Sequence, residues 1–216
     1  MSEPYPHFLP ELFNELYGCA TQQPITPSKL RRFFLLMLRG HWSDAANYGP
    51  DFQESLGCLN WTPDGKGSLG VELQGAKDVI TKQHMLWVSL GNFRTQQVTF
   101  GNRSTLSEDQ ATYHYSMPCT AQLLVSHDSP SLDQAMDMAW STCCFLMGFQ
   151  DSILDALGGD GTGFRVELVG NPEQRELAPK DRFRVDVGAA LSLNVAVATT
   201  LESHRLKRVA QNILPQ

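Results

Sequence analysis

The sequence predicts an α+β fold, in which an antiparallel (mixed) β-sheet packs against one long helix and is preceded by an N-terminal arm and a further helix. Three observations favour this fold. Residues Ala111 to Ser126 are rich in β-branched and aromatic side chains with polar ones between them, as in a strand. Residues 130–157 repeat apolar side chains at helical spacing. Phe164–Val169 and Arg182–Val187 alternate apolar with charged residues, which is typical of strands with one buried face.

The long helix has sequence signals at both ends. Ser129 is placed to cap it, Pro130 would be its first residue, and Gly158-Gly159 would end it. The expected core stripe comprises Leu132, Ala135, Met136, Ala139, Cys143, Leu146, Met147, Gln150, Ile153, Leu154 and Leu157. Four apolar residues lie outside this stripe, namely Met138, Trp140, Phe145 and Phe149. We therefore expect one side of the helix to pack on the sheet and a second side to contact another subunit.

The domain organisation follows from length and proline content. We expect an N-terminal arm at residues 1–27 and a single α+β domain at residues 28–216, long enough to bury a sizeable core. The arm contains Pro4, Pro6, Pro10, Pro24 and Pro27. Within it, Glu11–Tyr17 has room for two helical turns with Leu12, Phe13 and Leu16 on one side. Such a stripe needs a surface to pack on, in its own domain or in a neighbouring subunit.

The domain is expected to begin with a helix over Ser28–Arg39, opened by Thr26 or Ser28 and ended by Gly40. Its apolar flank includes the run from Phe33 to Leu38, which is far shorter than the roughly 20 residues that a membrane span needs.

A loop-rich insertion at residues 42–78 follows this helix, with glycine and proline turn signals. Its Pro63-Asp64-Gly65 turn lies between Leu59–Trp61 and Leu69–Leu73, and this arrangement predicts a hairpin.

Further strands are expected at His84–Leu90 and Gln96–Phe100, separated by a turn at Gly91-Asn92. Polar loops are expected at Gly101–Gln110 and at Gly170–Asp181, which connects the last two strands.

Three details concern the end of the domain. Pro118 has no N–H to donate, so it predicts an edge position or a bulge in its strand. Gly188–Ala190 marks a bend or bulge before the last strand continues through Leu191–Val197. A final helix is expected over Leu201–Leu214, with the basic residues His204, Arg205, Lys207 and Arg208.

Composition excludes some classes of protein. The formal net charge of −6 argues against a broad electrostatic grip on nucleic acid. The cysteines, at positions 19, 58, 119, 143 and 144, are odd in number and form no CxxC pair, so reduced thiols are expected. No basic region followed by an apolar core stands at the start, so we expect no secretory leader.

No motif predicts catalysis. Gly158–Gly163 closes a helix instead of opening one, so it is interpreted as a cap and turn and not as a phosphate loop. His127-Asp128 is interpreted as a solvated turn, and Asp133 with Asp137 as a solvated helix face. Cys119 has no neighbouring signature of a thiol enzyme. The histidines, at 7, 41, 84, 114, 127 and 204, have no metal-site spacing. The sequence therefore predicts a non-enzymatic scaffold with no catalytic, cofactor or metal residues.

The order of elements resembles the tail terminator proteins of tailed bacteriophages and their head-to-tail joining relatives. The residues that carry the resemblance are Tyr113–Val125 for a long strand, Ser129–Leu157 for the helix, and Phe164–Val169 with Phe183–Val197 for the last strands. The proline-rich arm and the Trp42–Asp78 insertion depart from the compact pattern of that family.

The resemblance implies a structural virion protein of the head-tail junction, assembled in the host cytoplasm. Such a protein is a homo-oligomer, a hexameric ring that caps the tail tube and connects it to the capsid neck. Its partners would be the tail tube protein and head-completion or neck proteins. DNA would pass through the channel without sequence-specific binding, and no membrane would be involved.

Two other hypotheses stay open. One is a small-molecule or peptide-binding α+β domain of non-viral origin, with a pocket between the sheet and the Trp42–Gly70 loops. The other is an enzyme whose catalytic residues are scattered in the sequence. Particle size separates the ring hypothesis from both of these, because a ring predicts an oligomer of about six chains.

Overall fold

The computed structural model describes residues 26–75, 82–95, 104–106, 112–157, 161–175 and 182–200. Most of the predicted arm, the strand Gln96–Phe100, the cap Gly158-Gly159 and the final helix Leu201–Leu214 lie outside the described residues.

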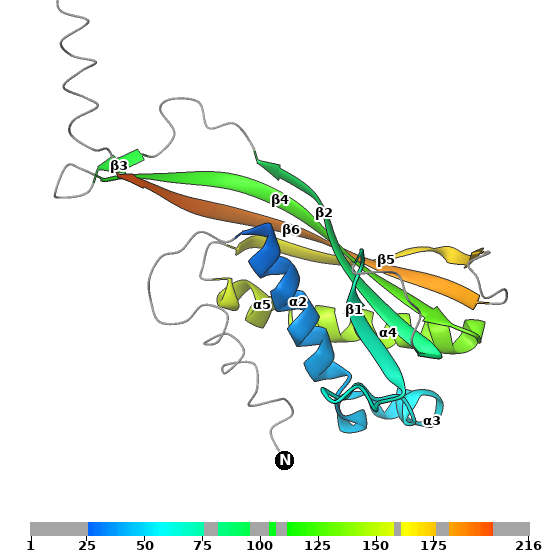
Figure 1. The fold of residues 1–216 in the computed structure, drawn as a ribbon. Coiled ribbons are helices and arrows are strands. Elements are labelled where there is room, and N and C mark those ends of the chain that lie inside the picture. Colours follow the sequence, from blue (N-terminus) through cyan, green and yellow to red (C-terminus); the bar gives the residue numbers. More distant parts are fainter. Residues whose placement is uncertain are drawn as a thin grey trace, which may run out of the picture.

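The fold is α+β, as predicted (Figure 1). The strands form one mixed sheet in the order β1-β2-β4-β6-β5, and β3 pairs with β4. β1 and β2 are parallel, and the other pairs are antiparallel. The strand bounds are β1 Leu69–Leu73, β2 His84–Thr95, β3 Ser104–Leu106, β4 Thr112–Ser129, β5 Gly161–Arg175 and β6 Arg182–Thr200.

Helix α2, Pro27–His41, confirms the first predicted helix and extends it slightly at both ends. The Thr26 hydroxyl caps it by accepting a hydrogen bond from the Lys29 N–H at 3.2 Å. Pro27 follows the cap, where its missing N–H has no helical partner to lose. None of the helices in the described ranges is long and apolar enough to cross a membrane.

The single long helix was predicted wrongly, because the segment folds as two helices: α4, Leu132–Gly148, and α5, Gln150–Ala156. They meet at Phe149, whose φ of −103° and ψ of 11° leave the helical region. Ser129 does not cap α4. It ends β4, and Ser131 caps the helix by accepting from the Gln134 N–H at 3.5 Å. The Ser129 hydroxyl instead accepts from the Ser131 N–H and contacts the buried His84 ring.

The loop-rich insertion contains three short helices, η1 Ala45–Asn47, η2 Pro50–Phe52 and α3 Gln53–Leu56. The predicted hairpin is wrong, because β1 pairs with β2 in parallel and residues 59–61 form no strand. Side chains use the backbone groups that a ladder would need: the Thr62 hydroxyl accepts from the Gly67 N–H, and the Ser68 hydroxyl accepts from the Asn60 N–H.

Strand pairing overrides several predicted turns. β2 continues through Gly91-Asn92, where the predicted turn is a bulge with Asn92 at φ 51°. Part of the predicted loop at 101–110 is β3, and β5 extends to Arg175 into the predicted connection.

Two predicted irregularities in the last strands have different outcomes. The predicted bulge at Gly188–Ala190 is absent, because β6 pairs with β4 without a register shift from Phe183 to Thr200. Gly188 and Ala189 are buried, so their small size serves close packing. Pro118 pairs with Asn194 of β6. The β2 residue that would lie opposite it falls outside the described residues, so the predicted edge position or bulge at Pro118 stays a prediction.

The helices cover one face of the sheet (Figure 1). Odd-numbered residues of β4 and β6, from Cys119 to Val125 and from Val185 to Leu193, are buried in the core that α2 and α4 complete. Even-numbered neighbours such as Thr120, Gln122 and Ala190 are exposed. One face of the sheet is therefore apolar and covered by the helices, and the opposite face is more polar.

We predict that Gly67→Ala destabilises the fold by about 1–3 kcal/mol, the usual cost of overpacking. A Cβ at position 67 would lie 2.4 Å from the Asn60 carbonyl oxygen and 2.9 Å from the Thr62 nitrogen, and these backbone atoms cannot swing away. Gly91→Ala is the matched control, because a Cβ there meets no atom within 4 Å. Urea unfolding measures both variants. Equal stability of the two would contradict the close approach at Gly67.

Candidate functional site

Helix α4 presents an apolar stripe to solvent. The relative exposures of Met136, Trp140 and Met147 are 46%, 50% and 58%, and these are large apolar residues. Cys144 is also exposed. Positions 136, 140, 144 and 147 are separated by three or four residues, so they line one face of the helix. We call this face the α4 stripe.

The predicted second apolar side of this helix exists, but its residues were assigned wrongly in part. Met136 and Met147 were placed in the core stripe and are exposed, whereas Met138 and Phe145 were placed outside it and are buried. The difference has a physical cause. Ser141 contacts the His41 ring and Thr142 contacts the His127 ring, and both residues are buried. The side of α4 that faces the core is therefore the one with these small polar residues, and Met136 and Met147 face solvent.

Two acidic residues of α4 lie beside the α4 stripe. Asp133 is exposed and Asp137 is half-buried, and helical spacing puts both on the flank that carries Trp140 and Cys144. Helix α4 contains no Lys or Arg. The helix face therefore combines apolar contact area with negative charge.

A cavity of about 390 Å³ opens beside the stripe, between α4 and the short helices η1 and η2. Cys144 and Gly148 of α4 line it together with the aromatic residues Tyr48, Phe52 and Phe149. The alternative hypothesis expected a pocket between the sheet and the Trp42–Gly70 loops; this cavity lies between α4 and those loops, and no strand residue is among those that line it.

His41, at the end of α2, also lines this cavity and is fully buried. Its Nε2 lies 3.3 Å from the Ser141 hydroxyl, its ring stacks on Phe145 at 4.2 Å, and its Nδ1 has no hydrogen-bond partner among the described residues. Burial, with a smaller contribution from His127, lowers the pKa of His41 to about 3. The His41 imidazole is therefore neutral at physiological pH and adds no positive charge to the cavity.

His127 was interpreted as part of a solvated turn, which is wrong, because it is fully buried in β4. Its Nδ1 lies 3.1 Å from the Val185 carbonyl and its Nε2 lies 2.8 Å from the Thr142 hydroxyl. Since a carbonyl only accepts, Nδ1–H is the donor and the Thr142 hydroxyl donates to Nε2. Burial lowers the pKa of this ring to about 4. The side chain thus joins β4, β6 and α4.

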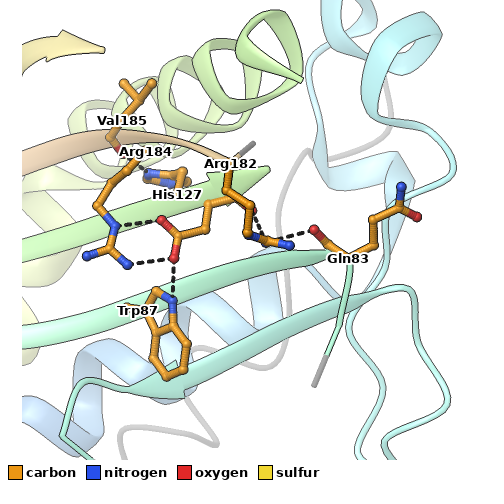
Figure 2. A network of polar contacts seen from close by, with 7 residues as sticks. Gln83, Trp87, His127, Arg182, Arg184 and Val185 are labelled. Atoms are coloured by element: carbon orange, nitrogen blue, oxygen red, sulfur yellow. Dashed lines mark hydrogen bonds and ion pairs between the residues drawn. The ribbon is translucent and has the colours of Figure 1, made fainter. Parts of the chain in front are cut away.

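Asp128 is buried as well and points to the opposite face of the sheet, since consecutive strand residues alternate. Its carboxylate accepts from Arg184 at 2.5 and 2.6 Å and from the Trp87 indole N–H at 2.8 Å (Figure 2). The Arg182 guanidinium donates to the carbonyls of Gln83 and Asp128. This network joins β2, β4 and β6 on the face that the helices do not cover.

The other candidate residues do not converge on a reactive centre. Cys119 and Cys143 are buried, Cys58 and Cys144 are exposed, and all four are free thiols. In the described ranges no group of three or more His, Cys, Asp or Glu side chains is placed to hold a metal ion. His7, His204 and Cys19 lie outside those ranges, and nothing is described of the His114 side chain. The feature with the clearest functional content is therefore the α4 stripe, of which the sequence prediction placed only Trp140 outside the core.

We predict that Asp128→Asn lowers the free energy of unfolding by about 3 kcal/mol or more, because it leaves Arg184 without its buried counter-charge. Glu72→Gln is the matched control. Glu72 pairs with Arg39 at 3.2 Å, but its side chain is 48% exposed, so its loss should cost less than about 1 kcal/mol. Urea unfolding at pH 7 measures both variants, and similar losses would contradict a structural role for Asp128.

A second prediction concerns pH. The pKa values of His41 and His127 lie below those of an unfolded chain, so the unfolded state binds protons first as pH falls. Stability should decrease from pH 6.5 toward pH 4, by at most about 1.4 kcal/mol per pH unit for each histidine. His127→Gln removes one titrating group and should flatten the slope between pH 6.5 and pH 5, even though the variant is less stable throughout. An unchanged slope in urea unfolding would contradict this assignment.

Comparison with known proteins gives no family for this chain. No protein-family model matches it, and no curated protein matches it either. Its function is therefore argued from its own surface and fold.

Proposed function

We propose that this chain is a structural virion protein of a tailed bacteriophage that forms a ring at the head-tail junction. It would act as a tail terminator or neck component, capping the tail tube, connecting it to the capsid neck and leaving a channel for DNA. The observation that carries the proposal is the α4 stripe, an apolar helix face that the described part of the chain leaves open.

The stripe supports assembly on energetic grounds. Exposed large apolar residues grouped on one face mark interaction surfaces, whereas isolated ones carry no such meaning. Covering the exposed half of a tryptophan removes on the order of 100 Å² from water, which contributes about 2–3 kcal/mol. Trp140 lies centrally between Met136 and Met147, as an aromatic anchor of an interface does.

The long β4–β6 ladder supports assembly on geometric grounds. β4 and β6 stay paired as far as Thr112 and Thr200, and the end of this ladder lies beyond the helices (Figure 1). A closed ring needs two different complementary surfaces on each subunit, and a projecting ladder with a separate apolar helix face supplies two.

Charge supports a channel that DNA passes without being held. The formal net charge is −6, so phosphate groups would be repelled overall instead of gripped.

The cavity favours a second candidate function, the binding of a small neutral ligand. Its aromatic lining, from Tyr48, Phe52 and Phe149, fits an apolar compound. The two candidates differ in particle size, because ligand binding needs no oligomer.

We predict that the purified protein forms annular particles of about six chains, alone or on its tail partner, in electron microscopy and mass photometry. Trp140→Glu should weaken assembly and raise the dissociation constant of the particles at least about tenfold, because a charge replaces the apolar anchor. Lys66→Glu, in a turn remote in sequence from α4 and strongly exposed, is the control and should leave assembly unchanged. Circular dichroism checks that both variants stay folded.

Two results would contradict the ring. One is a protein that stays monomeric at high concentration and on tail tubes; the other is assembly that tolerates Trp140→Glu as well as it tolerates the control.

A further inference from the structure

The α4 stripe has a shape and charge that restrict what can cover it. From Met136 to Met147 it spans about 16 Å at 1.5 Å per residue. Beside the stripe, α4 carries Asp133 and Asp137. The matching surface is therefore a short amphipathic segment with apolar residues on one side and basic residues beside them.

Residues 201–216 are such a segment, whereas the apolar side of the basic helix α2 is already buried in the core. In the helix predicted there, Leu206, Ala210 and Ile213 recur at helical spacing on one side. Arg205, Lys207 and Arg208 flank them, against the single acidic residue Glu202. The N-terminal arm is a poorer match, since residues 1–25 contain three glutamates and no Lys or Arg.

The fold decides where this segment starts. β6 ends at Thr200, paired with Thr112, at the tip of the ladder near β3 and away from the helices (Figure 1). Residues 201–216 therefore begin at the end of the ladder that lies away from α4. A segment that starts there is better placed to meet the α4 stripe of a neighbouring copy than the stripe of its own chain.

We propose that the α4 stripe is the docking surface for residues 201–216 of a neighbouring copy of this chain. The proposal rests on the proposed ring and names the contact that closes it. The ladder of one subunit delivers the basic segment to the acidic, apolar helix face of the next. Because the two surfaces differ, the contact is head-to-tail and propagates around a ring.

Cross-linking between two co-expressed, differently tagged full-length variants tests the contact. Both carry Cys19→Ser and Cys58→Ser. The first keeps the exposed thiol of Cys144 as the acceptor on the stripe. The second carries Cys144→Ser together with Ala210→Cys, and a short bis-maleimide joins the thiols. Gln211→Cys replaces Ala210→Cys as the matched control, because position 211 falls on the polar side of the helix.

The expected result is a product containing both tags, formed several-fold more with Ala210→Cys than with Gln211→Cys. Equal yields from the two variants would overturn the proposal. A third variant carries Cys144 and Ala210→Cys in the same molecule. A cross-link within one chain of this variant would also overturn the proposal. If annular particles form but no link appears, the docking proposal fails and the ring stands. If neither particles nor a link form, both fail.

Charge reversal gives an independent readout. Arg205→Glu with Arg208→Glu should weaken assembly at least about tenfold at low salt. Adding Asp133→Lys with Asp137→Lys should restore it. Weakening without restoration would overturn the pairing, since the defect would then come from another contact.

Discussion

The carboxylate of Asp128 lies buried between β2, β4 and β6, where Arg184 and Trp87 hold it. An unpartnered buried carboxylate costs several kcal/mol, so these strands are stable only in the register that brings the three side chains together. The adjacent His127 points to the other face and holds β6 and α4 through Val185 and Thr142. Two consecutive residues therefore constrain both the sheet and the helix that covers it.

The rotation of α4 follows from the same contacts. Thr142 contacts His127 and Ser141 contacts His41, so this small polar side of the helix faces the core. The consequence is that Met136, Trp140 and Met147 are turned toward solvent. The exposed apolar face of α4 thus results from satisfying buried polar groups on the other side of the helix, and the proposed assembly rests on this face.

The sheet is asymmetric along its strands. One face is dry and covered by helices, while β4 and β6 continue past them as a paired ladder without a register shift. A paired ladder is stiffer than a single extended strand because backbone hydrogen bonds hold each residue to its partner. The described fold therefore has a projecting element at one end and an apolar helix face elsewhere, and this asymmetry supports the head-to-tail ring that we propose.

The sequence by itself determined the local periods: the α+β class, the helix after Thr26, and the long strands at residues 111–126 and 182–197, which the structure extends to Ser129 and Thr200. It also placed Trp140 outside the core, because helical spacing is visible without a partner. Only the tertiary structure decided which polar residues are buried, as for Asp128, His127 and Ser141, since their partners lie far away in the chain. It also turned the predicted turn at Gly91-Asn92 into a bulge and the hairpin strand of Leu69–Leu73 into a parallel partner of β2. The physical reason is that local signals fix backbone preference, whereas pairing and burial are decided by the free energy of contacts between distant residues.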